Sequence, residues 1–137
     1  MLLSSTEQHE LLLVDDEADT LLELTEILEL EGYCCHTATS VRKALEQLTH
    51  HPYIGLVITD LQMPEESGVK LIQHLRAHCS RQHLPIIVTS YHNAADEVVD
   101  VLGLNVIDFF QKPIYHNRLL EILNRLLPAM PVKAVRL

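Results

Sequence analysis

Acidic side chains follow two short apolar runs of this chain. Asp15 and Asp16 come directly after the run LLLV, and Asp60 comes directly after the run IGLVIT. Carboxylates that lie close together repel one another by more than about 1 kcal/mol per pair at an effective dielectric constant of about 20. A hard divalent cation removes that repulsion, and Mg²⁺ prefers carboxylate oxygens together with retained waters. If the three acids converge in the folded chain, they predict a Mg²⁺ site.

Ser90 and Lys112 also stand at the ends of apolar runs. Ser90 closes the run PIIVTS, and Lys112 lies in the motif QKP. A serine hydroxyl can donate a hydrogen bond to an anionic oxygen, and a lysine ammonium is a compact positive charge. One such residue at a strand end is usually solvated surface, but five polar residues at the ends of four runs indicate a shared site.

This set of side chains has the chemistry of phosphoryl transfer to a carboxylate. An aspartate that is already ionised can act as the nucleophile without a general base. A cation and a lysine neutralise charge on the transferring oxygens, and phosphoryl transfer needs mainly positioning and electrostatic stabilisation. An alternative remains open for Asp15 or Asp16 taken singly, since either could be the N-cap of a following helix. A helix cap does not explain the pair together with Asp60.

Short apolar runs alternate with longer amphipathic segments along the chain, which predicts alternating strands and helices. The predicted strands cover residues 10–14, 33–37, 55–59, 85–89 and 106–111. The predicted helices cover residues 18–31, 40–50, 67–79, 94–102 and 115–126. Gly32 follows the first helix as a C′ residue, and Ser40 and Asn93 are N-cap candidates for the second and fourth helices.

Five strand–helix units in strict alternation predict an α/β fold with a doubly wound, five-stranded parallel sheet and helices on both faces. The central runs are almost uninterrupted apolar sequence, as in strands covered on both sides. In the strand order 2-1-3-4-5, the first and third strands are neighbours where the order reverses, and ligands bind there beyond the carboxyl ends of the strands. That order brings Asp15, Asp16 and Asp60 into one crevice.

Composition limits the classes of function. The formal charge of −9 and the pI of about 5.3 argue against direct nucleic-acid binding by this chain, because a phosphate backbone attracts a basic face. Cys34, Cys35 and Cys79 have no CxxC spacing, which disfavours zinc and disulfides and favours a reducing cytoplasm. The chain has nine histidines, of which His50, His51, His74 and His78 lie on helix-like or loop segments without a convergent partner, and solvated surface is the favoured interpretation.

Length and hydropathy predict one domain outside the membrane. No apolar stretch reaches the ~18 residues of a membrane span, and the first ten residues do not resemble a signal peptide. Residues 1–127 are predicted to form the domain. Residues 128–137, with two prolines and no periodicity, are predicted to be a tail or a linker.

Four motifs follow one another along the chain: VDDE, TDLQMP with Gly68 eight residues after Asp60, PIIVTS, and QKP. Ser90 lies 30 residues after Asp60, and Lys112 lies 22 residues after Ser90. In these motifs and spacings, residues 10–127 resemble the receiver domain of two-component response regulators. The resemblance implies a CheY-like (βα)₅ fold of the flavodoxin type.

The resemblance also implies a role for each residue of the site. Asp60 would be the phosphoacceptor, and Ser90 and Lys112 would hold phosphoryl oxygens. The ligands of Mg²⁺, which Mn²⁺ could replace, would be Asp16, Asp15 directly or through water, Asp60, and the backbone carbonyl of Gln62. The Lys112–Pro113 bond would be cis. Glu17 is interpreted as a bystander.

Receivers of this kind switch between two states, and the resemblance assigns this switch to Ser90 and Phe109. Phosphorylation adds negative charge and acceptor oxygens, so Ser90 would move toward them and vacate space for the Phe109 ring. Gln62 and His92 stand where the family tunes dephosphorylation. We hypothesise that the bulk of Tyr91 narrows access to the phosphoacceptor and slows exchange with small phosphodonors, an interpretation that ordinary packing of Tyr91 matches equally well.

The resemblance implies that a sensor histidine kinase or a histidine phosphotransfer protein supplies the phosphoryl group. An output domain or a downstream protein would read the surface formed by the fourth helix, the fifth strand and the fifth helix, and a homodimer could form through that surface. The chain would be a cytoplasmic phosphoacceptor switch rather than an enzyme, although it could catalyse its own phosphorylation and dephosphorylation. No direct contact with nucleic acid or membrane is expected.

Three other functions remain as alternatives. A haloacid-dehalogenase-like phosphatase also forms an aspartyl phosphate, but it needs a second acid two residues after the nucleophile, where this chain has Gln62. A flavodoxin-like FMN-binding protein needs a phosphate-cradling loop after the first strand, and the sequence DDEAD would repel that phosphate. A receiver could also act as a protein-docking module without phosphorylation, although all five site residues are present.

Overall fold

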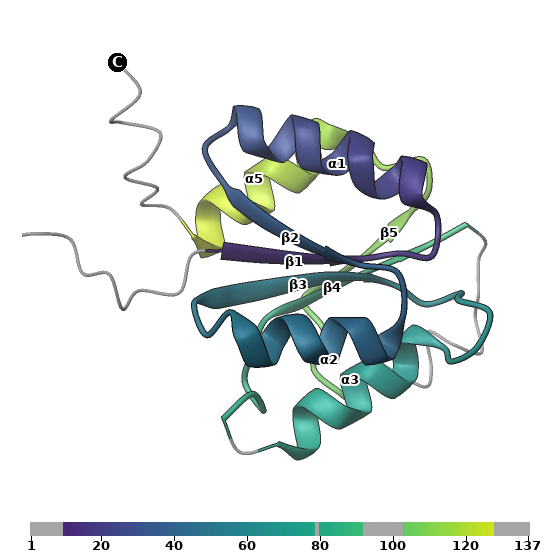
Figure 1. Ribbon diagram of the computed structural model, residues 1–137. Coiled ribbons are helices and arrows are strands. Elements are labelled where there is room, and N and C mark those ends of the chain that lie inside the picture. The colour runs from purple at the N-terminus through teal and green to yellow at the C-terminus, as the bar shows by residue number, and fades with distance from the viewer. Residues whose placement is uncertain (1–9, 79, 92–102, 128–137) are drawn as a thin grey trace, which may run out of the picture.

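The computed structural model describes residues 10–78, 80–91 and 103–127. Within these residues, five parallel strands form one sheet in the order β2-β1-β3-β4-β5. Helices α1 and α5 cover one face of the sheet, and helices α2 and α3 cover the other (Figure 1). The predicted doubly wound sheet and its strand order are confirmed.

Each described element lies within two residues of its predicted range. The strands are β1 Glu10–Val14, β2 Cys34–Ala38, β3 Ile54–Asp60, β4 Ile86–Ser90 and β5 Asp108–Gln111. The helices are α1 Ala18–Leu30, α2 Val41–His50, α3 Gly68–Ala77 and α5 His116–Leu126. The predicted fourth helix, 94–102, and its N-cap candidate Asn93 lie outside the described residues.

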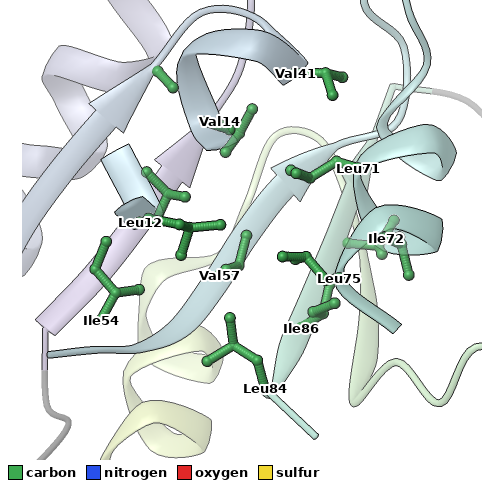
Figure 2. Packing of buried hydrophobic residues seen from close by; sticks show 14 of the residues in the cluster. Leu12, Val14, Val41, Ile54, Val57, Leu71, Ile72, Leu75, Leu84 and Ile86 are labelled. Atoms are coloured by element: carbon green, nitrogen blue, oxygen red, sulfur yellow. The ribbon is translucent and has the colours of Figure 1, made fainter. Parts of the chain in front are cut away.

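The hydrophobic core forms two layers, one on each face of the sheet. Successive residues of a strand point to opposite faces, so Leu12 packs toward α2 and α3 while Leu11 and Leu13 pack toward α1 and α5. Figure 2 shows the first layer, in which Val57 of the sheet lies beside Leu75 of α3. All seven residues of β3 are buried, because both layers cover this strand. That double cover accounts for its almost uninterrupted apolar sequence.

Gly32 and Ser40 fix the ends of two helices as the sequence predicts. Gly32 has a φ of 96°, in the left-handed region that favours glycine, and its N–H and that of Tyr33 donate to carbonyl groups of the last turn of α1. The Ser40 hydroxyl oxygen accepts a hydrogen bond from the N–H of Lys43 at 3.1 Å, which caps α2. These two turns lead the chain into and out of β2.

Candidate functional site

Three carboxylates converge at the carboxyl ends of β1 and β3. The two strands are neighbours at the centre of the sheet, with Val14 paired to Thr59, so the residues that follow them lie side by side. Asp15, Asp16 and Asp60 each offer an oxygen within 4.8 Å of the others. Asp15 and Asp60 are buried, whereas Asp16 is the most exposed of the three. The structure therefore brings the predicted acids together at the point where the strand order reverses.

Neither acid of the first pair caps helix α1. The N-cap position is Glu17, whose side chain makes no capping hydrogen bond. The Asp15 Oδ1 atom instead accepts a hydrogen bond from the Glu17 N–H at 2.9 Å, and the Asp60 Oδ1 atom accepts one from the Gln62 N–H at 3.1 Å. The interpretation of Asp15 or Asp16 as a helix cap is thus wrong, and these bonds hold the two buried carboxylates in fixed orientations.

Lys112 joins the two buried carboxylates. Its Nζ atom lies 2.6 Å from Asp15 Oδ2 and 3.3 Å from Asp60 Oδ2. Burial by itself would lower the pKa of Lys112, but the hydrogen bond to Asp15 and the charges of Asp60 and Asp15 outweigh burial and raise this pKa. The Lys112 N–H donates to the carbonyl oxygen of Ser90 at 2.7 Å, and the Lys112–Pro113 bond is cis. The lysine is therefore charged and positioned among the acids.

The environment of Asp60 opposes ionisation in the absence of a further cation. Burial raises the pKa of Asp60 to about 6, although the Gln62 N–H and Lys112 favour the charged form, and the Asp15 charge raises the pKa further. Three carboxylates against one ammonium leave an excess of negative charge. Oxygen ligands with excess negative charge, one of them open to solvent, fit a hard divalent cation that keeps part of its water.

Gly68 lets helix α3 begin against the backbone of Asp60. A Cβ atom at position 68 would lie 2.1 Å from the Asp60 carbonyl oxygen, closer than any side chain allows. The Gly68 N–H donates to the carbonyl oxygen of Leu61 at 3.0 Å, and the Ser67 hydroxyl oxygen caps the helix by accepting from the Val69 N–H. Any larger residue at position 68 must displace the strand end that carries Asp60.

Tyr91 forms a cover over the lysine. Its ring centroid lies 4.5 Å from Lys112 Nζ, its hydroxyl donates to Glu17 Oε1 at 2.8 Å, and its N–H donates to Gln62 Oε1 at 3.2 Å. The side chain is partly exposed while Lys112 is buried, so the ring lies between the ammonium and solvent. Glu17 does not belong to the group of three acids, but it accepts the hydrogen bond of the Tyr91 hydroxyl and lies 3.7 Å from Lys112 Nζ.

Two of the remaining predicted site residues, Ser90 and Phe109, lie on strands β4 and β5. Ser90 is the buried last residue of β4, one position beyond the Thr89 that pairs with Asp60. Phe109 lies on β5, pairs with Val88, and packs as a partly buried ring against the core layer that faces α2 and α3. His92 lies outside the described residues.

Comparison with known families decides what class of protein carries this site. A family model for the response regulator receiver domain matches residues 11–124. The chain belongs to this family. It is a receiver domain of two-component response regulators, a class of phosphoacceptor switches rather than classical enzymes.

Relatives agree with this assignment. The two-component response regulator PprB of Pseudomonas aeruginosa is 38% identical over 117 residues, which is 84% of this chain and 42% of PprB. The alginate biosynthesis transcriptional regulatory protein AlgB of the same species is 31% identical over 80% of this chain and 24% of AlgB. The chain thus spans less than half of the length of these relatives.

A solved structure agrees as well. A response regulator receiver protein from Pseudomonas putida has 39% sequence identity and a TM-score of 0.82, and the match covers 86% of this chain and 97% of that protein. Within the described ranges, none of the helices combines the length and the apolar character that crossing a membrane requires.

Proposed function

We propose that Asp60 of this receiver domain accepts a phosphoryl group in a Mg²⁺-dependent reaction. The observation that carries the proposal is the convergence of Asp15, Asp16 and Asp60 with the buried ammonium of Lys112 at one edge of the sheet. A structural ion pair would need one acid and one base. This site has more acid than its lysine neutralises: the excess negative charge would hold a divalent cation, and one of the carboxylates would accept the phosphoryl group.

Each residue contributes to positioning or to charge. A carboxylate oxygen of Asp60 forms the new bond to phosphorus as the bond from phosphorus to the donor's imidazole nitrogen breaks, and the electron pair leaves with that nitrogen. Bound Mg²⁺ would supply neutralisation of the transferring oxygens, held by Asp15, Asp16, Asp60 and the carbonyl of Gln62. Lys112 lies within reach of Asp60 and would pair with a phosphoryl oxygen.

The conformational response would run from Asp60 along the sheet to β5. Ser90 ends the strand next to β3, and a hydroxyl at that place can donate to a phosphoryl oxygen. A shift of Ser90 toward the phosphoryl group would free space for the Phe109 ring, which is partly buried and packs against the margin of its core layer. The surface that includes β5 and α5 would then change shape, and a partner protein would bind the changed surface.

Tyr91 would control access to Asp60. Three contacts hold it across the site: the ring on Lys112, the hydroxyl on Glu17 and the N–H on Gln62. A small phosphodonor that approaches Lys112 from the side of Tyr91 would meet this ring. The hydrogen bond to Glu17 would keep the ring closed between encounters, so the contacts favour the access hypothesis over ordinary core packing.

The phosphoryl donor would be a histidine kinase or a histidine phosphotransfer protein. The partner that recognises the phosphorylated domain would be an output domain or a separate protein. This follows from membership of the family, whose larger relatives carry additional sequence beyond the matched part. One of those relatives is a transcriptional regulatory protein by name. The excess of acid on this chain makes direct contact with nucleic acid by the receiver itself unfavourable.

A labelling experiment tests the proposal. The intact chain is incubated with acetyl phosphate, with and without Mg²⁺, beside an Asp60→Asn variant, and the gain of one phosphoryl group is followed by intact-mass measurement. We expect Mg²⁺-dependent labelling of the wild type and none of the variant. Labelling that survives Asp60→Asn would refute the assignment, and the absence of labelling and of any beryllofluoride response in the wild type would favour a docking module.

A further inference from the structure

A second group of metal-ligating side chains gathers at the opposite end of the sheet. Glu10 is the first residue of β1, Cys34 is the first residue of β2, and the two are paired in register. His36 lies two residues further along β2 and so faces the same side of the sheet. A ligand atom of each of these three residues lies within 4.8 Å of the other two.

The imidazole of His36 is held from two directions. Its Nε2 atom lies 2.8 Å from Glu10 Oε1, and the ring of His51 stacks on it with centroids 3.8 Å apart and planes at 20°. His51 is the C-cap residue of α2, so the end of that helix closes the group. The interpretation of His51 as solvated surface without a partner is therefore wrong.

The donor types select a class of cation. Zn²⁺ takes thiolate, imidazole and carboxylate ligands, whereas Mg²⁺ and Ca²⁺ take oxygen. Bond lengths of about 2.0–2.3 Å place the ligand atoms of a tetrahedral zinc about 3.3–3.8 Å apart. Atoms that already lie within 4.8 Å of one another need only side-chain rotation to reach that spacing. The exposure of Cys34 gives an ion a path to the group.

The surrounding charge favours a cation over a bare thiolate. Burial first, and then the carboxylates of Glu10 and Glu29, raise the pKa of the Cys34 thiol. The same negative potential attracts a divalent ion. On binding, the Cys34 S–H proton passes to solvent as the sulfur–metal bond forms. Glu10 exchanges its contact with His36 Nε2 for the metal, and the Nε2 proton moves to Nδ1 so that Nε2 can bind the ion.

We propose that Glu10, Cys34 and His36 form a binding site for one borderline transition-metal ion of the Zn²⁺ type, with water in a fourth position. The stacked His51 ring holds His36 in place. The site lies on one face of the sheet at the amino ends of β1 and β2, and Asp60 lies at the carboxyl end, since β1 alone spans roughly 13 Å. It is therefore independent of phosphorylation. The sequence disfavoured zinc because it lacks CxxC spacing, but these ligands come from two paired strands.

Cobalt is the direct probe, because Co²⁺ substitutes for Zn²⁺ and its bond to a thiolate absorbs light. The full chain is titrated with Co²⁺ in excess Mg²⁺, which would compete for the acidic site, and the bound Co²⁺ is then displaced with Zn²⁺. We expect one Co²⁺ per chain, a thiolate-to-cobalt charge-transfer band, loss of that band in Cys34→Ser, and release of the thiol proton into weak buffer. His36→Gln keeps every thiol and should weaken binding at least about tenfold.

Cys35→Ser is the matched control. Cys35 is the next residue of the same strand, but its side chain packs on the opposite face of the sheet, against the layer that contacts α1 and α5. Its removal should therefore leave the charge-transfer band and the Co²⁺ affinity unchanged. A band that persists in Cys34→Ser, a band lost equally in Cys35→Ser, or a wild type that shows no band would overturn the proposal. Each result is independent of whether Asp60 can be phosphorylated.

Discussion

The two ends of the sheet carry charged side chains in different surroundings. At the carboxyl end, the side chains of Asp15, Asp60 and Lys112 are 4%, 2% and 4% exposed. At the amino end, the side chains of Glu10 and His36 are 22% and 17% exposed. A buried charge destabilises the fold unless an opposite charge compensates for its lost hydration, whereas an ion pair that stays partly hydrated adds little to the free energy of folding. The carboxyl end should therefore respond strongly to the loss of a single charge, and the amino end weakly.

Removal of the buried cation should give the largest effect. Lys112→Met leaves two buried carboxylates without compensation, so we expect the free energy of unfolding to fall by about 3–5 kcal/mol in Mg²⁺-free urea denaturation. Lys70→Met on the exposed face of α3 is the control and should change little. His36→Gln at the amino end should cost at most about 1 kcal/mol. Equal stability of the Lys112 and Lys70 variants would contradict the difference between the two ends.

The pH dependence of stability tests the charge on Asp60. With a pKa of about 6 against the ordinary 3.8, folded Asp60 holds its proton more tightly than the unfolded chain does, so stability falls as the pH rises from about 4 to about 6. Asp60→Asn removes this loss. Without Mg²⁺ we expect the variant to be more stable than the wild type at pH 7 by up to about 3 kcal/mol, and by much less near pH 4.

Denaturation curves at the two pH values measure this difference. Addition of Mg²⁺ at pH 7 should narrow it, because the cation stabilises the ionised wild type more than the variant, which has lost one of the carboxylate ligands. If the two proteins differ in free energy of unfolding by the same amount at both pH values, then burial does not raise the pKa of Asp60.

The contact between α3 and the Asp60 backbone gives a smaller effect. Gly68→Ala places a Cβ atom against the Asp60 carbonyl oxygen, and we expect a loss of about 1–3 kcal/mol together with slower labelling of Asp60. Gly103→Ala is the control, because among the described residues no atom beyond its chain neighbours lies within 4 Å of a Cβ atom there. If the two variants label and unfold alike, the close approach at Gly68 does not position the site.

The smallest expected effect concerns the cover over Lys112. Tyr91→Phe removes the hydrogen bond to Glu17, and we expect the rate of labelling by acetyl phosphate to increase by no more than about tenfold, because this bond is exposed to water. Tyr91→Ala should increase that rate further. Tyr115→Phe, at a tyrosine that is 78% exposed, should leave it unchanged. Labelling rates that are equal in the wild type and Tyr91→Ala would remove the access hypothesis.

Much of the carboxyl end could be predicted from the sequence, because periodicity and topology determine it. The alternation of apolar runs and amphipathic segments predicts the doubly wound sheet, and the sheet places the residues after β1 and β3 together wherever their side chains point. The convergence of Asp15, Asp16 and Asp60 follows from that rule, whereas Lys112 follows the edge strand β5 and reaches the acids through its long side chain. Strand β3 continues to Asp60 because its ladder with β4 includes the Asp60–Thr89 pair, which periodicity alone does not reveal.

Contacts that depend on side-chain conformation could not be predicted. Tyr91 and Glu17 are 74 residues apart, and only the rotamer of the tyrosine brings its hydroxyl to the carboxylate. The group of Glu10, Cys34 and His36 depends on the register of β1 against β2, in which a shift of one residue would turn Cys34 to the other face. The spacing of these residues along the sequence predicts neither the Tyr91–Glu17 contact nor the group of three ligands.

Localisation of the phosphoryl group on the intact chain tests the central claim most directly. The protein is labelled with acetyl phosphate and Mg²⁺, the acyl phosphate is reduced with borohydride so that the phosphorylated aspartate becomes homoserine, and peptides are sequenced by mass spectrometry. We expect the reduced product at position 60 alone, and none when Mg²⁺ is omitted. Reduction at Asp15 or Asp16, or labelling of Asp60 that does not depend on Mg²⁺, would contradict the division of the acids into one acceptor and its cation ligands.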